Sequence, residues 1–217
     1  SHEWWGNLVT NKDWKDMWIH EGFGTYMQAL YVEQLKGKEW YYRYMEGQRG
    51  FANERAIAPK EITSSRDIYK SPIYAKGAWV LHTLRFLLGD EDFFKALRTM
   101  AYPTPEAALR TDGNQVRQVD TEEFVRICEE ISGRELDWFF EVYTYQPKLP
   151  TLKHNVLDNQ LFIQWESPVS GAFPMPVEVS VNGQIKKVEV PSSGAVLRIK
   201  AGDDIQLDPM NKVLKNK

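Results

Sequence analysis

Hydrophobic residues recur at helical spacing through the first two thirds of the chain. Between Trp14 and Leu35 they form two stripes with intervals of three to four residues, which predicts one long amphipathic helix. Shorter stretches with the same spacing follow, and segments in which Gly, Pro and Ser gather separate them as expected loops. The further helices are expected at 39–49, 75–88, 90–100, from 120 to the glycine at 133, and at 135–143, and the loops at 56–71 and 102–118.

The spacing changes after the proline-containing segment 146–150, where apolar and polar residues begin to alternate. Alternation of this kind is typical of half-buried strands, and Asn182-Gly183 between two such runs is a strong signal for a type I′ hairpin. The expected strands are 151–156, 161–165, 177–181, 185–190, 195–200 and 205–207. We therefore predict a multidomain α+β chain, with an all-helical part at 1–148 and a small antiparallel β-sandwich at 149–217.

The composition is that of a folded, soluble protein, with 42% hydrophobic and 26% charged residues in 217. A net charge of −3 and a pI near 5.9 give no electrostatic reason to expect a nucleic-acid partner. We interpret Lys212, Lys215 and Lys217 as a solvated basic terminus. The longest apolar run, 79–88, is interrupted by polar side chains and is shorter than the roughly 20 residues of a membrane-spanning helix, so no transmembrane segment is expected.

The single cysteine, Cys128, cannot form an internal disulfide and falls on an apolar helix face. We expect it to be a small buried hydrophobe. One cysteine does not decide between the cytoplasm and the periplasm, so the compartment stays open.

A carboxylate interrupts the first apolar stripe. Glu21 follows Met17 and Trp18 by three to four residues, so its side chain points where a hydrophobe is expected. An unpaired carboxylate there costs several kcal/mol, roughly, which favours a bound cation, although a glutamate at a helix start or in a salt bridge fits the position too. His20 projects about 100° away from Glu21, and His82 on an apolar helix is expected to be a hydrogen-bonded core histidine.

His2 stands ahead of Glu21 with 18 residues between them. In zinc peptidases with H-E-x-x-H on a helix, the two histidines hold zinc and the glutamate is the general base. The segments S-H-E-W-W-G-N-L-V-T at 1–10 and W-I-H-E-G-F at 18–23 resemble the aminopeptidase N-like family of gluzincin metallopeptidases, in which a glutamate from a second helix is the third ligand. The segment Y-K-S-P-I-Y-A-K-G-A at 69–78 is similar to the Y-x-K-G segment of that family.

This resemblance implies a thermolysin-like catalytic domain with one zinc ion in the intact site. By position, His2 and Glu21 are then metal ligands and Tyr74 is the catalytic residue that stabilises the tetrahedral intermediate. Tyr69, five residues earlier, is a wall of the same substrate pocket. The implied activity is hydrolysis of N-terminal residues from peptide substrates.

The resemblance also places the first histidine and the general base upstream of Ser1, together with the loop that captures the substrate amine. We therefore expect a fragment whose partners are the N-terminal domains of the same protein, with zinc bound weakly or not at all and no appreciable activity of its own. Without the resemblance, a lone tyrosine such as Tyr74 is a packing residue. The alternative function is a non-catalytic helical and β-sandwich interaction module, and the residues immediately before His2 distinguish the two.

Overall fold

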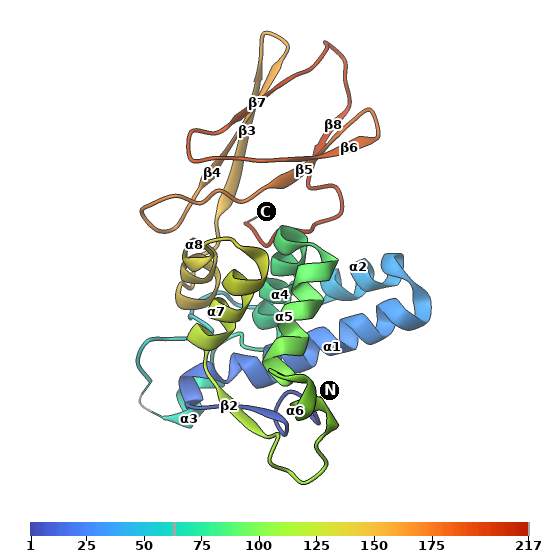
Figure 1. Cartoon of the computed structure of the whole chain (residues 1–217). Helices are drawn as coiled ribbons and strands as arrows, with labels where there is room; N and C mark the ends of the chain where they lie inside the picture. The colour runs from blue at the N-terminus through green and yellow to red at the C-terminus, as the bar shows by residue number, and fades with distance from the viewer. Residues whose placement is uncertain (63, 217) are drawn as a thin grey trace.

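The computed structural model describes residues 1–62 and 64–216, and its longer helices occur where the apolar spacing predicts them. Helices α1 and α4 pack against each other in the helical part, and the strands that follow residue 150 lie on one side of it (Figure 1). The longer helices are α1 (Trp18–Lys36), α2 (Lys38–Gly47), α4 (Ala75–Leu88), α5 (Asp90–Ala101) and α7 (Thr121–Ser132). The short ones are the 3₁₀ turn η1 (Trp14–Asp16), α3 (Ser65–Ile68), α6 (Pro105–Leu109), α8 (Asp137–Phe140) and the π-helical turn η2 (Glu141–Tyr145).

Two predicted features of the helical part are wrong. The expected loops contain the one-turn helices α3 and α6, and the part is not all-helical, because β1 (Val9–Asn11) pairs in parallel with β2 (Arg117–Val119). A strand of three residues is too short to show an alternating pattern, and its partner is more than a hundred residues away in the sequence. This ladder holds the N-terminal segment beside α7, where Lys12 pairs with the α7 cap Asp120 at 2.8 Å.

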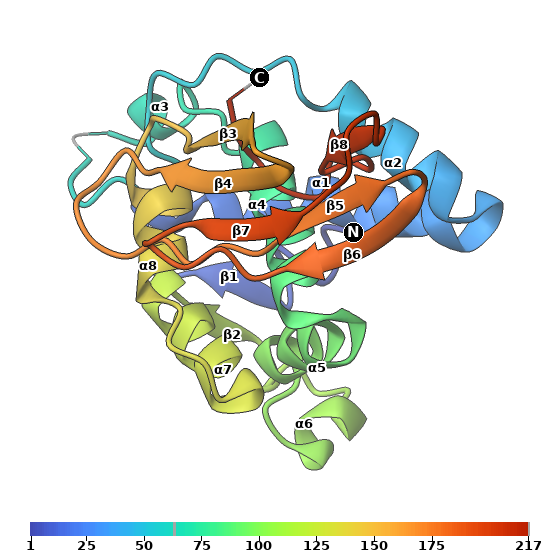
Figure 2. The same ribbon diagram turned by 90° about the horizontal axis from the view of Figure 1, so that it is seen from above.

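The six predicted strands after residue 150 form two antiparallel three-stranded sheets (Figure 2). One sheet has the order β3-β4-β7 and the other β6-β5-β8, and aliphatic residues of both, among them Leu161 and Val179, belong to one core cluster. Asn182 and Gly183 both have positive φ, 53° and 81°, as a type I′ turn requires. The strands are β3 (Thr151–Leu157), β4 (Gln160–Glu166), β5 (Val177–Val181), β6 (Gln184–Val188), β7 (Ala195–Arg198) and β8 (Ile205–Leu207).

The segment after β8 packs between the strands and the helices, so the prediction of a solvated basic terminus is wrong for Lys212 and Lys215. Lys212 pairs with Glu178 at 2.6 Å, and Lys215 pairs with the buried carboxylate of Asp208. These ion pairs neutralise the lysines while neighbouring aliphatic side chains enter the helical core. The buried aliphatic residues of this segment are Val213 and Leu214. Lys217 lies outside the described residues.

Within the described ranges, no helix has both the length and the apolar character that a membrane crossing requires.

Candidate active site

Glu21 lies in the first turn of α1, at a position fixed by buried aromatic contacts. The indole of Trp18, the first residue of the helix, is fully buried and donates a hydrogen bond to Thr121 Oγ1 at 2.8 Å. The ring of Phe23 packs against Trp18, with centroids 5.2 Å apart. These contacts anchor the turn from both sides, and the carboxylate of Glu21 is left 13% exposed at the edge of the core.

Two glycines next to Glu21 allow other parts of the chain to approach it closely. A Cβ at Gly22 would lie 2.8 Å from the Cα of Gly77, so α1 and α4 touch backbone to backbone at this point. A Cβ at Gly24 would lie 2.9 Å from Cε1 of His2. Gly22 therefore admits α4 on one side of Glu21, and Gly24 admits the imidazole on the other.

The imidazole of His2 faces Glu21. Its Nε2 is 3.9 Å from Glu21 Oε2, and its Nδ1 is 2.9 Å from the carbonyl oxygen of Trp5. Because a carbonyl only accepts, Nδ1 must carry a hydrogen, and Nε2 is the nitrogen that faces the carboxylate. Trp5 is itself buried, with its ring centroid 4.7 Å from that of Phe23, so this backbone carbonyl is firmly held.

Two phenols reach the same carboxylate. Tyr74 immediately precedes α4, at the end of the helix that touches α1. Burial, followed by the negative charge of Glu21 and a hydrogen bond with it, raises the pKa of Tyr74 to about 12, and the same causes raise the pKa of Tyr69. Both side chains remain partly exposed, at 44% and 48%. The structure thus brings together the four residues singled out in the sequence, as an imidazole, a carboxylate and two protonated phenols.

The donor atoms at this place fit part of a zinc site. Zinc takes imidazole nitrogen and carboxylate oxygen at about 2.0 to 2.2 Å, which puts two ligands of a tetrahedral ion about 3.4 Å apart. The 3.9 Å between His2 Nε2 and Glu21 Oε2 is close to that spacing. Over residues 1–62 and 64–216, no group of three or more His, Cys, Asp or Glu side chains is arranged to hold a metal. The described residues therefore offer two ligands here.

The other histidines have different environments. His20 Nε2 accepts from the Asn11 amide at 3.1 Å and lies 3.0 Å from Thr10 Oγ1, so that nitrogen is engaged away from Glu21, and burial lowers the pKa of His20. His82 is a hydrogen-bonded core residue as predicted, with Nδ1 2.6 Å from Tyr41 Oη, and burial lowers its pKa to about 4. His154 is exposed on β3.

The sequence interpretation missed the role of a charged residue between Tyr74 and Gly77. Lys76 is fully buried, and its ammonium donates to the backbone carbonyls of Gln146 and Pro147 at 2.7 and 3.2 Å. A lysine in the first turn of a helix that is otherwise apolar was the available signal.

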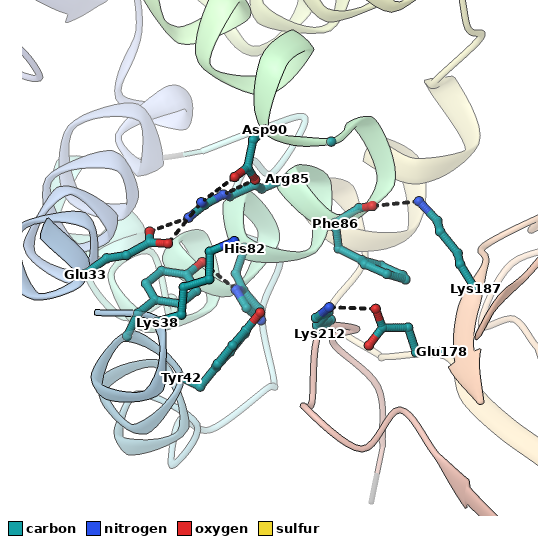
Figure 3. Close-up of a pocket in the computed structure, with 12 residues that line it drawn as sticks. Glu33, Lys38, Tyr42, His82, Arg85, Phe86, Asp90, Glu178, Lys187 and Lys212 are labelled. Atoms are coloured by element: carbon teal, nitrogen blue, oxygen red, sulfur yellow. Dashed lines mark hydrogen bonds and ion pairs between the residues drawn. The ribbon is translucent and has the colours of Figure 1, made fainter. Parts of the chain in front are cut away.

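A cavity of about 250 Å³ between the helices and β5 lies apart from these residues and is lined by charged side chains (Figure 3). Arg85 pairs with Glu33 at 2.6 Å and with Asp90 at 2.8 Å. Across the cavity, Lys212 pairs with Glu178. Lys187 of β6 donates to the carbonyl oxygen of Phe86 in α4 at 2.8 Å, so that this hydrogen bond joins the strands to the helices. These contacts indicate a structural role.

Known proteins match this chain over most of its length. The profile of the Peptidase family M1 domain matches residues 1–143. Aminopeptidase N of Lactococcus lactis subsp. lactis is 26% identical over 218 residues, covering 88% of this chain and 24% of the relative. Aminopeptidase M1-D of Oryza sativa subsp. japonica is 27% identical over 198 residues, covering 84% and 21%.

The fold also matches a solved structure. The crystal structure of Legionella pneumophila aminopeptidase A in complex with aspartic acid superposes with a TM-score of 0.75 at 22% identity, over 98% of this chain and 25% of that one. The chain therefore spans about a quarter of the length of the aminopeptidases that it matches.

Proposed function

Because the chain belongs to peptidase family M1, we propose that it forms one side of the active site of a zinc-dependent aminopeptidase that hydrolyses N-terminal residues from peptides. The observation that carries the proposal is the Glu21 carboxylate, which lies 3.9 Å from Nε2 of His2 at the edge of the core and close enough to Tyr69 and Tyr74 to help raise the pKa of both. Such an assembly at the edge of a core is costly unless a cation compensates the charge.

In this proposal each residue has one task. His2 Nε2 and Glu21 hold the zinc ion, and the Trp5 carbonyl orients the imidazole through Nδ1, as hydrogen-bond partners of metal-bound histidines do. When bound, zinc polarises the scissile carbonyl and lowers the pKa of water toward about 7. Tyr74 donates a hydrogen bond to the substrate oxygen as that oxygen gains negative charge, and Tyr69 lines the pocket beside it.

The raised phenol pKa supports the role of Tyr74. With a pKa of about 12, the hydroxyl keeps its proton at neutral pH and can donate it in a hydrogen bond. A phenolate would instead repel the developing oxyanion. Burial, and after it the neighbouring carboxylate, moves the pKa of this tyrosine still further above neutral pH.

We further propose that the helical residues 1–148 are part of a thermolysin-like catalytic domain and that residues 149–217 form a β-sandwich domain. Since the described residues supply two ligands, the third ligand and the general base come from another segment, which is the expected protein partner. Peptides are the expected substrates. The chain alone is then expected to bind zinc weakly and to show no appreciable turnover.

Zinc titration of the purified chain by isothermal calorimetry tests the metal site. We expect weak binding that falls about tenfold or more in His2→Ala and in Glu21→Gln, since each substitution removes one of two ligands. Tyr74→Phe should leave zinc affinity unchanged. His154→Ala, on an exposed strand position, is the matched histidine control. Equal zinc affinity in all five proteins would refute the metal site and favour the interaction module.

A further inference from the structure

Lys76 has no place in the hydrolytic steps described above, yet it lies two residues from Tyr74. None of its surface is exposed. Its ammonium has two partners, both backbone carbonyls, and no ion pair of the described residues includes it. Burial lowers the pKa of Lys76 to about 7, which shows how unfavourable the charge is in this place.

An apolar residue would fill the space at this position without the free-energy cost of burying a charge. Replacing buried charges by hydrophobic residues of similar volume is often neutral or stabilising. What an apolar residue cannot supply is the pair of hydrogen bonds to Gln146 and Pro147. These carbonyls stand directly after η2, where the chain leaves the helices for β3.

The hydrogen bonds of Lys76 complement the glycine contact of α4. Gly77 sets how closely α4 approaches α1. Lys76 attaches the same helical turn to a second place 70 residues further along the chain. At a rise of about 1.5 Å per residue, Tyr74 lies within one turn of both contacts, so fixing that turn fixes the direction of the phenol.

We propose that Lys76 is a positioning residue for Tyr74: its hydrogen bonds to the carbonyls of Gln146 and Pro147 hold the start of α4 so that the phenol points at Glu21. The inference rests on the proposed function, in which Tyr74 acts beside that carboxylate. It also makes the orientation of Tyr74 depend on the connection between the helices and the strands.

A double-mutant cycle with a spectroscopic probe tests this inference in the whole chain. 3-Fluorotyrosine is placed at position 74, and its ¹⁹F resonance is recorded at one fixed pH. In the native chain, Glu21→Gln should displace the resonance, since the charge of Glu21 helps to raise the pKa of the phenol. In the Lys76→Met background the same substitution should lose this effect, because the phenol no longer points at position 21. Loss of the coupling between positions 21 and 74 in the Lys76→Met background would show that the geometry of this pair depends on Lys76.

Two further variants keep the test decisive. Lys70→Met removes a surface ammonium that pairs with Asp67 at 2.8 Å in the same segment, and it should preserve the displacement. Pro147→Gly makes the backbone that carries the two acceptor carbonyls more flexible and leaves the buried lysine in place. It should also abolish the displacement of the resonance by Glu21→Gln. This variant therefore tests the positioning role if Lys76→Met does not fold. Circular dichroism checks the fold of each variant.

The outcomes separate the two proposals. If Glu21→Gln has no effect in the native chain, Tyr74 does not lie beside Glu21, and the proposed function falls together with the inference. If it displaces the resonance equally in native, Lys76→Met and Pro147→Gly chains, the proposed function stands and the positioning role of Lys76 is refuted.

Discussion

The crossing of α1 and α4 and the pair of β-sheets are stabilised in different ways. At the crossing, Gly22 meets Gly77 backbone to backbone, and an ammonium and a carboxylate lie at or near the core on either side. In the sheets, two of the four strand pairs are hairpins, β3–β4 and β5–β6, and aliphatic side chains such as Leu161 and Val179 fill the core between the sheets. The crossing depends on contacts between distant segments, whereas half of the strand pairs are local in sequence.

The difference indicates where chemistry can be built. Side chains that carry charge near a core need neighbours held at fixed distances, and close backbone contact supplies that rigidity. The charged side chains Glu178 and Lys187 of the sheets are engaged in an ion pair with Lys212 and in a hydrogen bond to the carbonyl of Phe86. Substitutions at the crossing should therefore affect both the site and stability, and substitutions in the sheets should affect stability alone.

The largest effect is expected from Tyr74→Phe. In a zinc-loaded form of the protein that also contains the third ligand and the base, kcat should fall by roughly 10² to 10³-fold, the usual cost of losing one oxyanion donor. Zinc content should stay the same, because the phenol is not a ligand. Tyr31→Phe, at an exposed position on α1, is the control. An unchanged kcat would mean that Tyr74 only packs, and a loss of zinc would assign it a structural role.

Acid should destabilise the chain through His82, which joins α4 to the segment after β8. The ring donates to the carbonyl of Asn211 at 3.1 Å, and burial lowers its pKa to about 4 from an unfolded value of 6.5. As the pH falls, the unfolded chain therefore binds the proton at a higher pH than the folded chain does. The stabilisation of the folded chain by neutral His82 is full above pH 6.5 and is lost as the pH falls from 6.5 through 4. Each unit of pKa shift corresponds to 1.36 kcal/mol, so the free energy of unfolding should fall by about 3 kcal/mol over this range.

Urea unfolding of the native chain, His82→Gln and the surface control His154→Gln between pH 7 and 4 measures this dependence. His82→Gln should have the shallower pH profile, and His154→Gln should follow the native one. Parallel profiles for all three proteins would show that His82 does not titrate with unfolding.

Gly77→Ala tests the crossing itself. The added Cβ would lie 2.8 Å from the Cα of Gly22, and backbone on both sides leaves no flexible group to move. Forcing the helices apart should lower the free energy of unfolding by about 1 to 3 kcal/mol. It should also move the ¹⁹F resonance of a fluorotyrosine at position 74.

Gly47→Ala is the matched control, because a Cβ there meets no atom within 4 Å and α2 gains a better helix former. It should stabilise the protein by about 0.5 to 1 kcal/mol. Equal responses of the two glycines would contradict the close contact of α1 and α4.

The sequence predicted those parts of the fold that a local pattern encodes. Helix α4 follows the predicted range, and α7 begins after its cap Asp120 and ends before Gly133, which has φ of 65°. His2, Glu21 and Tyr74 were proposed as site residues from motif spacing, and their roles stay predictions. The close approaches at Gly22, Gly24 and Gly77 give a physical reason for glycine in those motifs.

Features whose cause lies far away in the sequence were missed. The three-residue strands β1 and β2 are too short to show an alternating pattern of apolar and polar residues. Their paired residues are more than a hundred positions apart in the sequence. Lys215 has the composition of a solvated tail, but its partner Asp208 is buried by the fold itself. Lys76 was passed over for a similar reason, because its carbonyl acceptors are 70 residues away and carry no side-chain signal.

The smallest destabilisation is expected from Gly183→Ala in the hairpin of β5 and β6. Gly183 has φ of 81°, where alanine costs about 1 to 2 kcal/mol, and the added Cβ meets no other atom within 4 Å. The cost is therefore backbone strain alone, and we expect the free energy of unfolding to fall by about 1 kcal/mol. Because the turn is remote from α1 and α4, zinc affinity and the ¹⁹F resonance at position 74 should not change. A change in either would show that the sheets and the site are coupled, and the division between a local and a long-range region would no longer hold.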